Sequence, residues 1–592
     1  MSAAFGAVLG VATALVALAV AQAVAAFISS QVGEPVDAVG ELSINHTPPS
    51  LKNFAIREFG SNDKTVLVWG IRAVLIVFAI VIGILALRKL WYGLIGLAVF
   101  IAIGVYAAES QPTSRGIDAL PTLIGGLAAA LFMWRASGVG RRALTYRAGA
   151  PARLATPPRA TPPRAVPPPT VPPKTDAPAP EPPASRPPSP TEAEPQDSDP
   201  WQGWLPSYDR DSGSGWRDRG RPAARPALSG YEDQQSRRRF LLASAGAAGA
   251  SLAVYAGATW LAENRAVSVA QKSLKFPRAA TAAPPLPAGY DLKIPGLSPF
   301  ITPNGSFYRV DTAIVLPEVL PASWHLRIHG MVQRELVLSF DDLIRRPLLE
   351  DYITLCCVSN PVGGPYVGNA KWLGASLRSL LQQAGIRAGA DQLLCTSADG
   401  FTSGTPVQTA MDGRDAMLAV AMNGTALPIA HGFPARLVIP GLYGYVSACK
   451  WITDIEVTTY AANTSYWAQR GWSAQAPIKT ESRIDVPGFG ASVKAGHQTA
   501  IAGVAWAQHK GIDAVEVKVG SGPWQPAQLA SVPDLDTWRQ WVYQWDANVE
   551  PGNYVIQARA TDKTGYTQTS LQEPPEPNGA SGYPSTTVTV TS

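Results

Sequence analysis

Residues 423–451 read NGTALPIAHGFPARLVIPGLYGYVSACKW, a stretch in which Asn, Gly and Pro separate short apolar runs. The runs 435–439 and 451–459 have the length and the apolar, β-branched content of strands. The same pattern predicts strands at 325–328 and 352–356, and the leucine spacing in 377–384 predicts a helix. From about residue 295 onward, the sequence therefore predicts an α+β fold.

The part of the chain before this region has a different composition. Apolar stretches near the length of about 20 residues that spans a bilayer lie at 3–28, 66–87, 91–108, 117–134 and 240–262. The loop 29–65 is acidic, whereas Arg88, Lys89 and Arg135 follow the second and fourth stretches, so the positive-inside rule puts the N-terminus in the cytoplasm and the residues after 262 outside. The alternative is a soluble protein with five uncapped, apolar core helices.

Few ionisable groups lie within these stretches. We expect Arg72 and Asp118 near the external interface, where snorkelling lowers the cost of a charge. His46 is the only histidine before residue 325, so no haem held by two histidines is expected in the membrane part. The chain has four Cys and no C-x-x-C, which excludes zinc ribbons and covalent c-type haem, and we expect no haem in this chain.

The segment 138–235 is rich in Pro, Arg and Ala and too poor in apolar residues to bury a core, so we expect a disordered linker. Residues 236–241 read SRRRFL and resemble the twin-arginine export motif. The alternative is an ordinary basic flank of the fifth span. The net charge of +5 includes no basic stripe interleaved with aromatics, so nucleic acid is not an expected partner.

A cysteine pair in the α+β region indicates its chemistry. Residues 354–360 read TLCCVSN, and WLG follows at 372–374. This arrangement resembles the C-x-G-N segment of the sulfite oxidase superfamily of molybdopterin enzymes. Aligning Asn360 with the family's Asn makes Cys357, and not Cys356, the molybdenum ligand, and a thiolate suits that metal. Taken alone, a buried strand Cys is more often a small apolar side chain.

The stretch 423–451 is similar to the family's L-P-x-x-H-G-F-P-x-R-x-x-x-P-G…S-x-K-W block. The resemblance implies that Arg436 and Lys450 bind the phosphate of a molybdopterin cofactor, and that His431 and Ser447 hydrogen-bond to its pterin. Asp399 occupies the position of a family Asp near the cofactor. Each of these residues, taken singly, is also consistent with a solvated loop.

Residues 304–312 read NGSFYRVDT and match the segment that contacts the pterin, which implies that Tyr308 and Arg309 bind the cofactor. Sulfite-oxidising relatives usually read F-Y-x-R-N-H here. Arg309 is one place earlier than the family Arg, and Thr312 stands where the family has His. Pro361 and Val362 stand where an Arg follows the Cys motif. Because an oxyanion needs fixed guanidinium donors, these departures favour a neutral substrate over sulfite.

Two further segments carry expectations. Residues 466–472 read YWAQRGW, in which Arg470 is a candidate catalytic cation at the substrate mouth, and an interdomain packing strip is the alternative. Residues 482–592 resemble the superfamily's C-terminal immunoglobulin-like dimerisation domain, a β-sandwich that implies a possible homodimer.

The expected multi-domain organisation is as follows: a four-helix transmembrane region at 1–137, a cytoplasmic linker at 138–235, the twin-arginine-like motif and fifth span at 236–262, a molybdopterin-binding domain at 295–465 and an immunoglobulin-like domain at 482–592. This predicts a multi-pass protein of the bacterial cell membrane with an extracytoplasmic catalytic domain.

The expected function is oxygen-atom transfer by a molybdopterin-dependent oxidoreductase, with sulfoxide or N-oxide reduction favoured and sulfite dehydrogenation as the alternative. The expected partners are a small substrate, a separate electron-transfer protein or carrier, and the twin-arginine export machinery. An alternative of another class is a catalytically silent binding or scaffold module on a membrane stalk.

Overall fold

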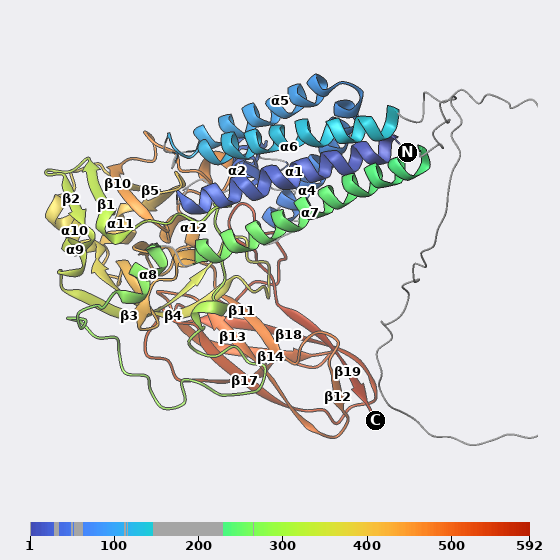
Figure 1. Cartoon of the computed structure of the whole chain (residues 1–592). Coiled ribbons are helices and arrows are strands. Elements are labelled where there is room, and N and C mark those ends of the chain that lie inside the picture. The colour runs from blue at the N-terminus through green and yellow to red at the C-terminus, as the bar shows by residue number, and fades with distance from the viewer. Residues whose placement is uncertain are drawn as a thin grey trace, which may run out of the picture. The chain divides into compact units, whose positions relative to one another are not determined.

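The structure is a computed structural model that describes residues 2–28, 35–48, 51, 63–111, 114, 116–145, 229–263 and 266–592 (Figure 1). The described residues of 1–144 and 236–592 belong to one compact unit. The predictions for most of the linker concern residues 146–228, which lie outside the described residues.

Four long apolar helices confirm the first four predicted stretches, and each is long and apolar enough to cross a membrane. They are α1 (Ser2–Phe27), α4 (Asp63–Arg88), α5 (Leu90–Glu109) and α6 (Leu120–Thr145). Helix α6 continues past residue 138, where the sequence predicted the linker to begin.

The fifth predicted stretch lies in the 35-residue helix α7 (Ser229–Glu263). Its apolar part, Leu242–Ala258, is shorter than the four candidate spans and than the roughly 20 residues that a span needs. The fifth span therefore stays a prediction.

Glycines explain why α1 and α4 lie close together. A Cβ placed on Gly10 would lie 1.8 Å from the carbonyl oxygen of Ala79, and one placed on Gly83 would lie 2.2 Å from the carbonyl oxygen of Gly6. No larger side chain fits at these positions, which is the small-residue packing typical of helices in membranes.

A short helix, α2 (Pro35–His46), follows α1. Its Ala38 is buried in a cluster with Ala107 and Ala108 at the end of α5, with Leu42 packed against them. The Gln111 side-chain amide donates to the carbonyl oxygen of Ala38 at 3.3 Å. These contacts fix α2 against the helix ends on one side of the bundle.

The region after residue 295 has the strands and helices of the predicted α+β fold, and its strands form one mixed and one antiparallel sheet. One sheet has the order β2-β1-β10-β5-β6, with β1 and β10 parallel. These strands are β2 (Leu336–Ser339), β1 (His325–Gly330), β10 (Ile452–Thr458), β5 (Gln392–Ser397) and β6 (Thr402–Pro406). The other has the order β3-β4-β7-β8, with β9 paired to β7. Its strands are β3 (Leu348–Cys356), β4 (Val367–Ser376), β7 (Met417–Met422), β8 (Thr425–Ala426) and β9 (Arg436–Val438).

Four short helices complete this region: α9 (Phe340–Ile344), α10 (Leu377–Ala384), α11 (Val407–Met411) and α12 (Gly444–Ser447). The bounds of α10 confirm the prediction for 377–384, and its leucines are buried in the shared core. Ser376 caps its first turn, and Gly385 ends it with a positive φ of 71°, which glycine adopts without strain.

The C-terminal region is rich in strands and forms two sheets. The first has the order β11 (Glu481–Val486), β13 (Gln498–Trp506), β17 (Arg539–Asp546) and β16 (Gln528–Leu529). The second has the order β12 (Ser492–Lys494), β19 (Ser585–Thr591), β18 (Gly552–Asp562), β14 (Ile512–Val519) and β15 (Gln525–Pro526). Trp541 of the first sheet and Val517 of the second share one buried cluster, so the sheets pack face to face.

This β-rich region stabilises the strand that ends at the cysteine pair. The hydroxyl of Thr354 accepts from the Trp538 backbone N–H at 2.7 Å, and its carbonyl oxygen accepts from the Gln508 side chain at 2.8 Å. The Trp538 indole donates to the carbonyl oxygen of Phe300 at 2.8 Å. Hydrogen bonds from the C-terminal region therefore fix the end of β3, immediately before the residues of the site.

Candidate functional site

Cys357 is the first residue after β3, and a closed loop fixes its position. Its backbone N–H donates to the carbonyl oxygen of Tyr366 at 2.9 Å, and its carbonyl oxygen accepts from the N–H of Asn360 at 3.1 Å. The Asn360 side chain, 2% exposed, accepts from the Tyr366 N–H at 2.8 Å. Asn360, on which the resemblance to the family segment was aligned, thus stabilises this loop through its hydrogen bonds.

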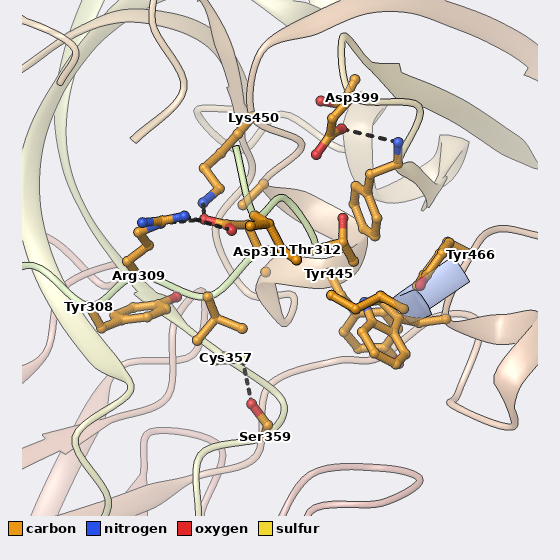
Figure 2. A pocket seen from close by; sticks show the side chains of 18 of the residues that line it. Tyr308, Arg309, Asp311, Thr312, Cys357, Ser359, Asp399, Tyr445, Lys450 and Tyr466 are labelled. Atoms are coloured by element: carbon orange, nitrogen blue, oxygen red, sulfur yellow. Dashed lines mark hydrogen bonds and ion pairs between the residues drawn. The ribbon is translucent and has the colours of Figure 1, made fainter. Parts of the chain in front are cut away.

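The two cysteines point to different environments. Cys357 lines a cavity of about 780 Å³, whereas Cys356 is fully buried in the hydrophobic core and is absent from the cavity lining. The Cys357 sulfur lies 2.9 Å from the hydroxyl of Ser359 (Figure 2). Burial raises the pKa of the Cys357 thiol, and Ser359 partly opposes this. This placement is the one that a ligand at Cys357 requires, and the ligand role stays a prediction.

Arg436 is a buried cation on the cavity wall. Its side chain is on β9, is 5% exposed and donates to the carbonyl oxygens of His431 at 3.1 Å and Ala448 at 3.2 Å. Its guanidinium carbon lies 5.1 Å from the centre of the Trp372 ring. Burial lowers the pKa of Arg436 to about 10, so a bound anion would stabilise its charged form.

Lys450 and Arg309 share one carboxylate. The Lys450 ammonium lies 2.6 Å from Asp311 Oδ2, and the Arg309 Nε lies 2.8 Å from the same oxygen. Figure 2 shows Asp311 between the two cations. The Asp311 side chain is 4% exposed and that of Lys450 is 11% exposed, and burial lowers the pKa of Lys450 to about 8. Both cations line the cavity.

His431 and Tyr308 line the same cavity. The His431 Nε2 lies 3.2 Å from the carbonyl oxygen of Asn304. Burial, with the charges of Arg436 and Lys450, lowers the pKa of His431 to about 4, so the ring is neutral near pH 7. Burial raises the pKa of Tyr308, so its phenol keeps its proton.

Asp399 and Ser447 are placed differently from each other. Asp399 lines the cavity, and its Oδ1 accepts from the backbone N–H of Phe401 at 3.1 Å. Burial raises its pKa. Ser447 is fully buried and donates to the carbonyl oxygens of Leu442 at 3.0 Å and Tyr443 at 3.1 Å. The structure brings Ser447 to the helix behind the site and not to the cavity wall.

Arg470 does not line the cavity among the described residues. It donates to the carbonyl oxygen of Tyr466 at 2.6 Å, and its guanidinium carbon lies 3.6 Å from the centre of that ring. The neighbouring aromatics Tyr466, Trp467 and Trp472 do line the cavity. The segment 466–472 therefore contributes aromatic rings to the cavity wall. Its cation, Arg470, contacts Tyr466 of the same segment instead.

The sequence analysis gave no role in the site to Asp311, Trp69 or Arg72, which line the cavity. Asp311 carried a signal, because it adds a carboxylate directly beside the departures from the family pattern. Arg72 also carried a signal as an ionisable group near the external end of a span, where we expected only snorkelling.

The lining fits an anionic, metal-bearing cofactor. Among the described residues, the cavity wall carries the cations Arg72, Arg309, Arg436 and Lys450 against two carboxylates, Asp311 and Asp399. Two of these cations have lowered pKa values because they are buried, and an anion would relieve that penalty. No three His, Cys, Asp or Glu side chains in the described part of the chain are placed to hold a metal by themselves. A cofactor that brings its own metal ligands needs only the one thiolate of Cys357.

Comparisons with known proteins agree with this chemistry. Residues 313–467 match the family described as oxidoreductase molybdopterin binding domain. Sulfite oxidase of Gallus gallus is 30% identical over 313 residues, which cover 45% of this chain and 67% of that protein. The uncharacterized oxidoreductase YuiH of Bacillus subtilis (strain 168) is 30% identical over 149 residues, which cover 25% of this chain and 72% of that protein.

One further relative matches over less of its length, and one solved structure aligns over more. The chain spans 56% of the mitochondrial sulfite oxidase of Mus musculus, at 29% identity over 44% of this chain. The crystal structure of the sulfane dehydrogenase SoxCD from Paracoccus pantotrophus aligns with a TM-score of 0.41 and 23% identity, over 48% of this chain and 80% of that chain.

The family match and these relatives assign the chain to the molybdopterin-dependent oxidoreductases, and the thiol and the buried cations around its cavity fit that class. This chain belongs to the sulfite oxidase superfamily of these enzymes.

Proposed function

We propose that the chain is a membrane-anchored molybdopterin enzyme that reduces a small, neutral S-oxide or N-oxide. The observation that supports a neutral substrate is the double ion pair of Asp311. The Asp311 carboxylate pairs with Arg309, which neutralises that guanidinium, and also with Lys450. Arg470 does not line the cavity. Neither arginine that the sequence offered as an oxyanion ligand therefore presents an unpaired positive charge to the substrate.

The residues of this chain would hold the cofactor at both ends. Cys357 would bind its molybdenum, Arg436 and Lys450 its phosphate, and His431 and Tyr308 its pterin. When bound, the cofactor would supply the two-electron, oxygen-transfer chemistry. Ser447 would act from behind by fixing the turn of α12 through its two hydrogen bonds.

Asp399 would supply a proton. Reduction of an S-oxide consumes two protons and two electrons and releases the sulfide and water. Because burial raises the pKa of Asp399, its carboxyl group holds a proton more readily than an exposed one. Its Oδ1 accepts from the backbone N–H of Phe401, so Oδ2 would be the oxygen that carries the proton in this role.

Sulfite oxidation is the second candidate. The excess of cations on the cavity wall would attract an anion, and relatives of this chain are named sulfite oxidases. The two candidates run the chemistry in opposite directions, so they predict different substrates for the same protein.

Steady-state assays of the full chain separate the candidates. With an artificial electron donor, we expect turnover of a sulfoxide and poor oxidation of sulfite. Efficient sulfite oxidation that collapses in Arg470→Ala would refute the neutral-substrate proposal and assign that cation to the substrate. A chain purified without molybdenum or pterin, and inactive with both substrates, would instead support a silent binding or scaffold module.

The remaining organisation is proposed on the sequence and the helix lengths. We propose that 1–137 and 236–262 anchor the chain in a bacterial cell membrane, with 138–235 as a cytoplasmic linker. The catalytic domain at 295–465 and an immunoglobulin-like, dimerisation-type domain at 482–592 would lie outside, exported by the twin-arginine route. Electrons would come from a separate protein or carrier.

A further inference from the structure

One wall of the cavity comes from the membrane part of the chain. The cavity that Cys357 lines is also lined by Ile44, Thr47, Leu67, Val68, Trp69 and Arg72, from α2, the residue after it and the first turns of α4. A hydrogen bond holds this wall in place, because the backbone N–H of Ile314 donates to Glu41 at 3.0 Å. Ile314 also contacts α2 directly, since a Cβ placed on Gly40 would lie 2.8 Å from the Ile314 Cδ1 and would require that side chain to shift.

Aromatic rings from the catalytic half also line this cavity. Trp467 packs edge to face against Tyr466 at 5.1 Å and against Trp472 at 6.1 Å between ring centres. In the membrane part, Trp69 is 63% exposed, and the Arg72 guanidinium carbon lies 5.2 Å from its ring centre. This wall is therefore apolar and aromatic, with one cation.

The position of Trp69 relates the cavity to the bilayer. It lies in the first turns of the candidate span Val66–Arg88, at the end that the charge pattern places outside. Tryptophan at that depth occupies the interface between headgroups and acyl chains. In that topology, a molecule dissolved in the lipid would reach this wall without crossing the aqueous phase.

An apolar, aromatic wall of this kind suits the binding of a membrane-soluble electron carrier. The sequence has no second histidine before residue 325, so the helices of this part hold no haem between two histidines. A carrier that is flat, apolar and soluble in the membrane would stack on the rings. Its carbonyl oxygens would accept hydrogen bonds from a guanidinium such as that of Arg72.

We propose that this wall binds a membrane-soluble quinol, which donates electrons to the site. The inference rests on the proposed function. The quinol loses two electrons and two protons and becomes the quinone. The S-oxide takes up two electrons and two protons and becomes the sulfide and water, so the sum is quinol plus S-oxide giving quinone, sulfide and water.

The test uses the full chain in lipid nanodiscs, with a photoreactive azido-quinone as the probe. We expect peptide mass spectrometry to find the label in 66–72 or 466–472, and an excess of unlabelled short-chain ubiquinone to abolish it. Labelling confined to other segments, or unaffected by the competitor, would overturn the inference.

Two matched tryptophan variants sharpen the result. Trp69→Ala is expected to raise the dissociation constant of the short-chain ubiquinone about tenfold, because it removes an aromatic contact. Trp91→Ala is the control, since Trp91 is 53% exposed on the helix α5 and does not line the cavity. An unchanged constant in Trp69→Ala, or an equal change in both variants, would refute the site.

A dye-driven assay separates this inference from the proposed function. Reduction of a sulfoxide with an artificial donor needs no quinol. Turnover with the dye but no quinone labelling would refute the quinol site and leave the proposed function standing. Labelling without dye-driven turnover of any S-oxide or N-oxide would refute the proposed function, and with it the donation of electrons from this wall.

Discussion

Replacing Asp311 with Asn tests the charge arrangement of the site most directly. The variant keeps the shape of the side chain and removes the carboxylate that pairs with Lys450 at 2.6 Å and with Arg309 at 2.8 Å. The Arg309 side chain is 40% exposed, so water screens much of that pair. The larger effect comes from Lys450, which is 11% exposed.

The magnitude follows from removing one partner of a buried ion pair, which costs about 3–5 kcal/mol in the free energy of unfolding. Lys450 avoids part of this cost by losing its proton, because burial already lowers its pKa to about 8. Without Asp311 we expect the pKa of Lys450 in the folded protein to fall further. Its pKa in the unfolded chain stays near the ordinary value of about 10.4.

The sign of the pH dependence follows from these pKa values. Below pH 8 the wild-type folded and unfolded states both carry the Lys450 proton, so this group adds no pH dependence there. In the Asp311→Asn variant the folded state lacks the proton while the unfolded state holds it. The extra destabilisation therefore grows by about 1.4 kcal/mol for each pH unit below 8, until the lowered pKa is reached.

Urea unfolding of the detergent-solubilised, cofactor-free chain at pH 6, 7 and 8 measures this change. Asp485→Asn is the matched control, because Asp485 pairs with Arg483 at 2.6 Å and both side chains are as buried. Arginine does not lose its proton in this range, so the control's destabilisation should not vary with pH. A pH-independent loss in Asp311→Asn would refute the reasoning about Lys450.

The cofactor-loaded protein extends the same experiment. If Lys450 binds the phosphate, the bound anion replaces the missing carboxylate, and Asp311→Asn should destabilise the loaded protein less than the cofactor-free one. Equal losses in both forms would show that the anion lies elsewhere.

Three further changes test other parts of the chain. Cys357→Ser should abolish activity and change the molybdenum spectrum while Cys356→Ser leaves both largely intact, and the opposite result would move the ligand by one residue. Burial raises the pKa of Asp351 to about 8, so its folded state holds the proton more tightly, and the free energy of unfolding falls by about 1.4 kcal/mol for each unit that the pH rises from 4 to 8. Asp351→Asn should remove this fall. Urea midpoints across that range check this, and an unchanged slope would contradict it. Replacing Arg237 and Arg238 with Lys should trap the catalytic half in the cytoplasm, and reporter fusions that still read external would reduce the motif to a basic flank.

Local sequence patterns predicted the elements of the fold well. The helix at 377–384 followed from leucines at helical spacing, and the four apolar stretches followed from their length and composition. The choice of Cys357 over Cys356 came from aligning Asn360 with the family's Asn, and the structure places Cys357 on the cavity wall and Cys356 in the core. Each of these inferences depends on neighbours within a few positions.

Contacts between distant segments were not predictable in this way. Asp311 and Lys450 are 139 residues apart, and only the folded chain shows that they pair. The cavity wall formed by α2 and α4 has the same origin, because the Glu41 contact with Ile314 joins residues 273 apart. Neither pair leaves a periodic signal in the sequence.

The position of Asp311 explains how the three departures from the family segment together change the charge of the site. Where sulfite-oxidising relatives read F-Y-x-R-N-H, this chain has Val310 in place of the Arg, Asp311 in place of the Asn and Thr312 in place of the His. Arg309 supplies a guanidinium one position earlier, and Asp311 binds it at 2.8 Å. The segment therefore contributes a neutral pair where the family pattern contributes a positive charge. A neutral ion pair attracts an oxyanion only through its dipole, so it adds little binding free energy for sulfite. A neutral S-oxide does not need a positive charge for its binding. The substrate preference that we propose follows from this difference in charge.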